Sequence, residues 1–150
     1  MKISILLPYK ENYSPTYPGA VSIFVSSTNK LSKYKKEVTI YGSTDHQRKL
    51  SANYININLK KKILRSQSKE YVSKFLEIQK IKNPDIIEIH NRPIYVEQLV
   101  QLKSNLVLYF HNDPISMIGS KSVSERVNLL AICSKIIFNS EWSKKQFLKD

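Results

Sequence analysis

Five short runs of mainly apolar residues, mostly β-branched or aromatic, recur along the sequence without regular alternation of apolar and polar residues. They cover residues 3–7, 38–41, 86–89, 106–110 and 136–138. A strand with one face in water alternates apolar and polar side chains, whereas a strand buried on both faces reads as a continuous apolar block. The runs therefore predict the inner strands of a parallel sheet that is covered on both sides.

The segment 54–59 differs from these runs, because its apolar residues alternate with asparagines. Ile55, Ile57 and Leu59 are separated by Asn56 and Asn58. Such alternation predicts a strand with one wet face, which is tolerated at the edge of a sheet. We therefore expect a sixth, edge strand over 54–59.

Helical spacing of apolar residues occupies the segments between the strands. The expected helix faces are Val21, Phe24, Val25, Thr28 and Leu31; Val72, Phe75, Leu76 and Gln79; Tyr95, Leu99 and Leu102 after Pro93; Val127, Leu130 and Ala131; and Trp142 and Phe147. A capping box at Ser122–Glu125 and a cap at Ser140 predict the starts of the last two helices. Alternating strands and helices predict an α/β fold in which residues 1–150 form a single domain, a doubly wound, mostly parallel sheet of order 3-2-1-4-5-6.

Polar residues follow the expected strands at the edge where such sheets bind ligands. His90, Asn91 and Arg92 come after one strand, and His111 and Asp113 come after the next. Carboxyl ends of parallel strands share one edge, so these side chains are expected in one crevice. Two alternatives stay open: each histidine is a loop residue bonded to the backbone, and Asp113 is part of a turn.

The loop after the first strand contributes a second group of candidate residues. Gly19 and Ala20 open a helix, where backbone N–H groups can approach a phosphate, and Tyr9 and Tyr17 can stack on sugar rings. A turn before a helix and tyrosines packed onto the surface are the alternatives. The dinucleotide and P-loop glycine patterns are missing, so a redox cofactor is not expected. No metal site is predicted either, since the histidines lack zinc spacing and Cys133 is alone.

Net charge and cysteine content indicate which ligands and which cellular compartment suit the protein. The chain has 24 Lys and Arg against 12 Asp and Glu, a formal charge of +12. This excess suits phosphorylated ligands or an anionic membrane face, although lysines spread over solvated surfaces explain most of it. Basic residues are dense in 30–36 and in 60–82. A single cysteine in an apolar stretch fits a buried thiol in a reducing compartment. We expect a cytoplasmic protein, with contact at the inner face of the membrane as one use of these charges.

Three stretches of this sequence resemble family-4 glycosyltransferases of the GT-B type. They are Pro84-Asp85-Ile86-Ile87-Glu88-Ile89-His90-Asn91-Arg92-Pro93 and Leu108-Tyr109-Phe110-His111-Asn112-Asp113-Pro114, followed by Phe138-Asn139-Ser140-Glu141-Trp142. The resemblance covers essentially the whole chain and implies the N-terminal, Rossmann-like half of a two-lobed enzyme. Such an enzyme moves a sugar from a nucleotide-diphospho-sugar to a glycan or lipid-linked acceptor, usually with retention and without a further cofactor.

The resemblance also implies roles for individual residues. His111 matches the histidine that faces the transferred sugar, with Asp113 beside it, and Gly19 matches a loop glycine near the donor diphosphate. His90, Asn91 and Arg92 would line the acceptor side. Many members have Gly-Gly where this chain has Gly19-Ala20. In the family the donor binds mainly to a C-terminal lobe, which is absent from these 150 residues, so we expect this chain alone to be inactive.

Two other functions remain as alternatives. One is a different Rossmann-like enzyme that binds a nucleotide at the Gly19 loop. The other is a basic nucleic-acid-binding module, which the charge suggests but which lacks any RRM, KH or helix-turn-helix pattern. We therefore do not expect nucleic acid as a partner.

Overall fold

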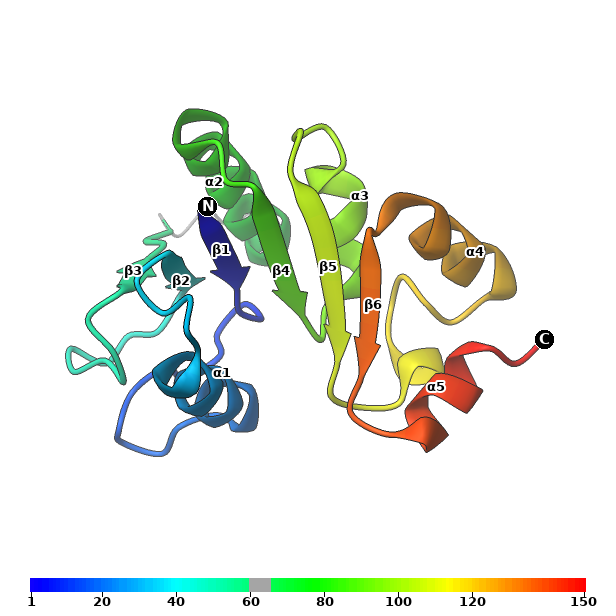
Figure 1. The fold of residues 1–150 in the computed structure, drawn as a ribbon, viewed down its shortest axis with the longest axis horizontal. Coiled ribbons are helices and arrows are strands. Elements are labelled where there is room, and N and C mark those ends of the chain that lie inside the picture. The colour runs from blue at the N-terminus through cyan, green and yellow to red at the C-terminus, as the bar shows by residue number, and fades with distance from the viewer. Residues whose placement is uncertain (60–65) are drawn as a thin grey trace.

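The structure is a computed structural model that describes residues 1–59 and 66–150. The described residues form one sheet of six parallel strands in the order β3-β2-β1-β4-β5-β6 (Figure 1). The strands are β1 (Ile3–Leu6), β2 (Val38–Gly42), β3 (Tyr54–Asn56), β4 (Ile86–His90), β5 (Asn105–Phe110) and β6 (Lys135–Phe138). The predicted doubly wound fold and its strand order are confirmed.

Helices connect the strands in the predicted alternation. They are α1 (Ala20–Leu31), α2 (Gln67–Lys82), α3 (Val96–Leu99), α4 (Val123–Ile132) and α5 (Glu141–Phe147), with 3-10 turns at Pro93–Tyr95 and Pro114–Ser116. The capping box forms as predicted, because Ser122 Oγ accepts from the Glu125 N–H and Glu125 accepts from the Ser122 N–H. Ser140 likewise caps α5 by accepting from the Ser143 N–H.

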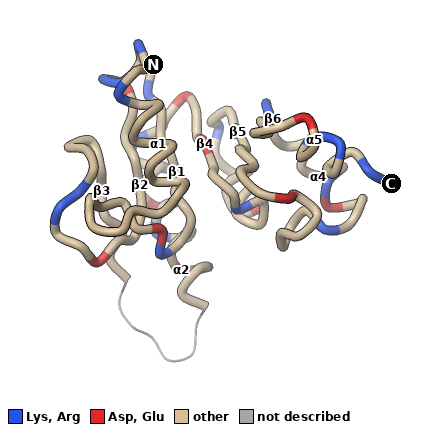
Figure 2. The backbone as a smooth tube through the Cα atoms, turned by 90° about the horizontal axis from the view of Figure 1, so that it is seen from below, with Lys and Arg blue, Asp and Glu red and all other residues tan. Residues whose placement is uncertain are grey.

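The handedness of the connections decides which face each helix covers. A right-handed crossover puts its helix on one face when the chain moves toward one edge of the sheet and on the other face when it moves back. The connection through α1 leads from β1 toward the β3 edge, whereas those through α2, α3 and α4 lead toward the β6 edge. Figure 2 shows α1 and α2 on opposite sides of the row of strands. Of these four connecting helices in the described part of the chain, only α1 therefore lies on its face of the sheet.

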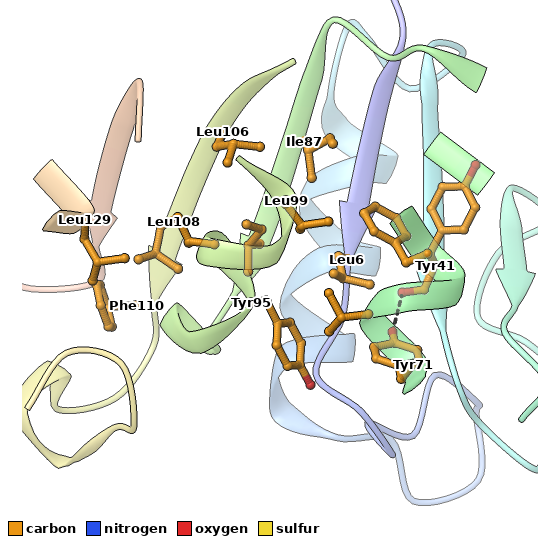
Figure 3. Packing of buried hydrophobic residues seen from close by; sticks show 14 of the residues in the cluster. Leu6, Tyr41, Tyr71, Ile87, Tyr95, Leu99, Leu106, Leu108, Phe110 and Leu129 are labelled. Atoms are coloured by element: carbon orange, nitrogen blue, oxygen red, sulfur yellow. Dashed lines mark hydrogen bonds between the residues drawn. The ribbon is translucent and has the colours of Figure 1, made fainter. Parts of the chain in front are cut away.

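The larger core lies between the sheet and the helices α2, α3 and α4 (Figure 3). Strand residues Leu6, Ile87 and Leu108 pack there against Phe75 of α2 and Leu99 of α3. Two buried hydrogen bonds lie on this face: Ser4 Oγ donates to Gln79 Oε1 at 2.7 Å, and the Tyr71 hydroxyl donates to the Leu7 carbonyl at 2.9 Å. The other amide atom of Gln79, Nε2, is buried without a partner among the described residues. Most of the buried apolar surface of the described residues is on this side.

The smaller core lies under α1. Alternate strand residues such as Ile5 and Ile40 pack there against Val21 and Val25 of the helix. The predicted stripe is confirmed for Val21, Phe24 and Val25, but Thr28 and Leu31 are exposed, because the buried residues of α1 all lie in its first two turns.

The edge strand β3 is shorter than the six residues predicted. Its last register partner is Gly42, opposite Asn56, where β2 ends. With no further strand to pair with, the chain leaves the ladder and buries Ile57, while Ile55 stays exposed. The alternation of residues 54–59 therefore does not continue as a single apolar face.

The apolar face predicted for α4 is also wrong. Val127 and Leu130 are 58% and 55% exposed, and the buried residues are Arg126 and Leu129. The Arg126 guanidinium donates to the carbonyls of Ser120, Lys121 and Lys149, which satisfies its donors and permits its burial. In α5, Phe147 is buried as predicted, whereas Trp142 is exposed.

Basic residues are distributed over several separate parts of the surface (Figure 2). The lysines of 30–36 lie at the amino ends of the strands, since they directly precede β2. Of the basic segment 60–82, residues 60–65 lie outside the described part of the structure. None of the helices in the described ranges is long and apolar enough to cross a membrane.

Candidate active site

The two histidines predicted to share a crevice are in direct contact. Strands β4 and β5 are paired in parallel, with His90 opposite Tyr109, so the residues that end β4 and follow β5 meet at one edge. The His90 Nδ1 and His111 Nε2 atoms lie 2.8 Å apart, which is a hydrogen-bonding distance. The His90 side chain is fully buried, and that of His111 is half-buried.

A carboxylate contacts the other nitrogen of the buried His90 ring. The Glu88 Oε1 atom lies 2.6 Å from His90 Nε2. Residues two apart on a strand point to the same face, so Glu88 and His90 share the face that α1 covers. Glu88, His90 and His111 thus form a continuous hydrogen-bonded row, called the Glu-His-His row below.

Aromatic rings fix the positions of both imidazoles. The Tyr109 ring stacks on His90 and His111, with centroids 5.4 and 4.5 Å apart, and the Phe24 ring meets His111 edge-on at 4.9 Å. This packing excludes water from one side of the imidazoles. Burial raises the pKa of Tyr109, and the Glu88 charge raises it further.

The surroundings also shift the titration of His111. Burial lowers its pKa from 6.5 to about 4, and the neighbouring His90 adds to this effect, while Glu88 partly opposes it. Since the ring is uncharged at neutral pH, it can accept a proton or a hydrogen bond there.

Asn91 joins the loops that follow β4 and β5. Its backbone has a φ of 56°, in the left-handed region that asparagine tolerates better than most residues. In this conformation its Oδ1 accepts from the His111 N–H at 3.2 Å, while its own N–H donates to the Tyr109 carbonyl at 2.8 Å. From the loop after β6, Asn139 Nδ2 donates to the His111 carbonyl at 2.7 Å. Three neighbouring strand ends are therefore held together around His111.

A pocket of about 430 Å³ opens beside His111, at the point where β1 and β4 lie side by side and the chain direction across the sheet reverses. Its lining residues are Pro8, Glu11, Ala20, Val21, Asn91, Arg92, His111 and Asn112. We call it the histidine pocket. Four of the predicted site residues, Ala20, Asn91, Arg92 and His111, are thus brought together.

The N-terminus of α1 borders this pocket, and a carboxylate of the chain itself occupies it. Glu11 Oε1 accepts from the Ser22 N–H at 3.0 Å, and the Glu11 carboxylate lies directly against Gly19. A side chain at position 19 would collide with that carboxylate. A phosphate bound at these N–H groups would therefore have to displace Glu11.

Three predicted site residues lie elsewhere. Tyr9 lines a separate pocket of about 350 Å³ and donates from its hydroxyl to Gln67 Oε1 at 2.5 Å. Tyr17 is 91% exposed. Asp113 accepts from the Ile115 N–H at 3.3 Å, so its carboxylate stabilises the turn rather than lining the histidine pocket. His90 belongs to the Glu-His-His row but has no surface to offer a ligand.

The two carboxylates of this site, Glu88 and Glu11, were not predicted. Glu88 left a signal, since a carboxylate two residues before a histidine in a strand shares its face. Glu11 left none, because only the path of the loop between β1 and α1 brings it to the helix N-terminus.

Within residues 1–59 and 66–150, no three His, Cys, Asp or Glu side chains are grouped so that they could hold a metal ion. No protein-family model matches the sequence. No curated protein matches it either.

Proposed function

We propose that this chain is the acceptor-side domain of a GT-B glycosyltransferase and that the acceptor hydroxyl binds in the histidine pocket. The observation that carries the proposal is the convergence of His111, Asn91 and Arg92 at the point of the sheet where doubly wound folds bind ligands. The resemblance of residues 84–93 and 108–114 to this family supports it independently.

The lining of the pocket suits a polyhydroxylated ligand. Asn91, Asn112 and Glu11 offer amide and carboxylate groups, and His111 offers a neutral ring nitrogen. Hydroxyl groups both donate and accept, so a wall of mixed donors and acceptors matches a sugar better than a purely basic wall would. The pocket is also too small for a folded nucleic acid.

Arg92 gives the pocket its fixed positive charge. Its side chain is exposed and donates to the Asn91 carbonyl at 3.0 Å, so the guanidinium is held near the pocket wall. Glycosyl transfer releases a diphosphate, and a guanidinium stabilises the negative charge that develops on it. In this proposal, and unlike the roles that the family resemblance implies, Arg92 faces the leaving group and His111 faces the acceptor hydroxyl.

A lipid-linked acceptor is compatible with the proposal, but the lysines of 30–36 would not serve it. They lie at the amino ends of the strands, whereas the histidine pocket lies at the carboxyl ends. A membrane docked on those lysines would thus be on the far side from the pocket.

The test is an NMR titration of the ¹⁵N-labelled chain with separate probes: a panel of mono- and disaccharides, UDP-glucose, GDP-mannose, UDP alone and a short single-stranded RNA. We expect saccharides and nucleotide sugars to shift the amides of Ala20, Asn91 and His111. Arg92→Ala should weaken nucleotide-sugar binding by about 10-fold, since a charge-assisted hydrogen bond is worth about 1.5 kcal/mol or more. Asp45→Ala is the matched control, because Asp45 is an exposed residue of the separate Tyr9 pocket.

Three outcomes would overturn the proposal. If saccharides shifted only the amides of the Tyr9 pocket, the acceptor site would lie there and not in the histidine pocket. A response to UDP alone, with none to any saccharide, would favour a different nucleotide-binding enzyme. A response only to RNA would favour the nucleic-acid module.

A further inference from the structure

We propose that Glu88 and His90 are positioning residues of a proton relay that makes His111 Nδ1 the general base of the histidine pocket. This inference rests on the proposed function for the identity of the proton donor, an acceptor hydroxyl. The relay itself is a property of the hydrogen-bonded row and can be tested without a substrate.

The direction of the hydrogen bonds follows from the carboxylate end of the row. A carboxylate accepts hydrogen bonds and donates none, so the 2.6 Å contact to Glu88 requires a proton on His90 Nε2. A neutral imidazole carries one proton, which leaves His90 Nδ1 as an acceptor. The 2.8 Å contact is then donated by His111 Nε2–H, and the bare lone pair of His111 is on Nδ1.

Burial determines which of the two histidines can contact a ligand. His90 is fully buried between the Tyr109 and Phe24 rings and cannot touch a ligand. His111 lines the histidine pocket, and its Nδ1 has no hydrogen-bond partner among the described residues. Glu88 therefore acts on the ligand only through His90, by selecting the His111 tautomer.

The same row can take up the proton that His111 removes. As the acceptor O–H bond breaks, the proton goes to His111 Nδ1, and the oxygen electron pair forms the bond to the anomeric carbon of the donor. The bond from that carbon to the diphosphate breaks, and its electron pair leaves with the diphosphate. The proton on His111 Nε2 passes to His90 Nδ1, and the resulting imidazolium is paired with the Glu88 carboxylate.

This transfer matters because His111 alone is a weak base. Burial and the adjacent His90 ring hold its pKa low, so a proton that stayed on it would be poorly stabilised. A buried imidazolium beside a carboxylate costs less than an isolated one. The other titratable or charged groups that face the row are Tyr109, which stacks on both rings, and Glu11 and Arg92 in the pocket wall.

The first measurement is the ¹⁵N spectrum of the histidine side chains at pH 7. We expect both His90 and His111 to carry their proton on Nε2. A proton on His90 Nδ1 would overturn the relay. So would a proton on His111 Nδ1, because the pocket would then hold no bare imidazole nitrogen.

The second measurement is the acylation rate of each histidine by diethyl pyrocarbonate, read by mass spectrometry. This reagent reports the nucleophilicity of a bare imidazole nitrogen. Glu88→Gln keeps the size of the side chain but removes its charge, and we expect the rate at His111 to fall by about 10-fold, because removing a carboxylate that orients an imidazole weakens it as a base. Glu88→Asp should recover part of the rate, and exposed His46 is the internal control. An unchanged rate at His111 in Glu88→Gln would contradict the relay.

These two measurements separate the inference from the proposed function. Tautomers and acylation rates as expected, without any saccharide binding, would keep the relay and reject the sugar acceptor. Saccharide binding with an unaffected His111 in the Glu88 variants would keep the acceptor and reject the relay.

Discussion

The imidazoles of His90 and His111 are separated by 21 residues in the sequence, yet their facing nitrogens lie 2.8 Å apart. The contact exists because β4 and β5 are parallel neighbours whose carboxyl ends coincide. It joins a buried ring to one that borders a pocket. Because the contact exists only in the folded chain, the pKa of His111 differs between the folded and unfolded states.

The low pKa of His111 predicts a loss of stability in mild acid. The unfolded chain takes up a proton on this residue near pH 6.5, whereas the folded chain does so only at about pH 4. The unfolded state therefore binds more protons between these values, and the free energy of unfolding falls as the pH drops through that window. The two values set a ceiling of about 3 kcal/mol, but the ring is only half-buried and water screens it, so we expect about 1 kcal/mol.

Urea unfolding at pH 7 and pH 4.5 checks this expectation. His111→Asn removes the titrating group, so the loss between the two pH values should be smaller in the variant by about 1 kcal/mol. Equal pH dependence in the two proteins would show that His111 titrates normally in the folded chain.

Asn91 combines a left-handed backbone with a hydrogen bond to His111, and two substitutions separate these features. Asn91→Gly loses the hydrogen bond but tolerates the positive φ, at a cost of about 1 kcal/mol. Asn91→Ala loses the same bond and adds backbone strain, for a total of about 2 kcal/mol. Thermal or urea unfolding gives both values, and an alanine variant as stable as the glycine variant would contradict the strain.

Arg126 links the start of α4 to the end of the chain. Its guanidinium is buried and donates to three backbone carbonyls, so Arg126→Ala removes these bonds and leaves the carbonyls unpaired. We expect the free energy of unfolding to fall by about 2–4 kcal/mol. Lys145→Ala, an exposed change on α5, should stay within about 0.5 kcal/mol, and a similarly small effect at Arg126 would refute its structural role.

The Tyr71 hydroxyl is buried in the larger core and donates to the Leu7 carbonyl. Tyr71→Phe keeps the ring but removes this bond, and it should destabilise the fold by about 1–2 kcal/mol. Burial also raises the pKa of Tyr71 well above 10, so its phenol should not ionise before the protein unfolds in alkali. Tyr34→Phe is the exposed control, and difference absorbance during a pH titration follows the phenolates.

Cys133 is expected to react slowly with thiol reagents. Burial raises the pKa of its thiol from 9.0 to about 11, and only the thiolate reacts. At pH 8 iodoacetamide should therefore modify it roughly 100-fold more slowly in the folded chain than in urea. Similar rates in both states would mean that the thiol is accessible.

The fold was predictable because its signals are local and repeated. Continuous apolar strands, helical stripes and two capped helices each indicated an element, and the handedness of crossovers fixed their arrangement. The errors came from tertiary effects. Strand β3 ends where β2 stops offering a partner at Gly42, and α4 turns Arg126 inward because backbone carbonyls, among them that of Lys149, receive its guanidinium. Gly42 and Lys149 are both far in sequence from the residues that they pair with.

The site was predictable in part for the same reason. His90 and His111 follow adjacent parallel strands, so topology alone predicted their meeting. No comparable rule predicts the path of the loop between β1 and α1. Its course includes a left-handed Lys10 and carries Tyr9 toward α2 and Glu11 toward α1, which no periodicity in the sequence indicates.

Because the histidines lie on the face that α1 covers, the ligand pocket and the larger core are on opposite sides of the sheet. Substitutions along α1 and in the loop before it can reshape the pocket, while the core on the opposite face stays intact. Related proteins can therefore change their ligand specificity in evolution while each intermediate sequence still folds.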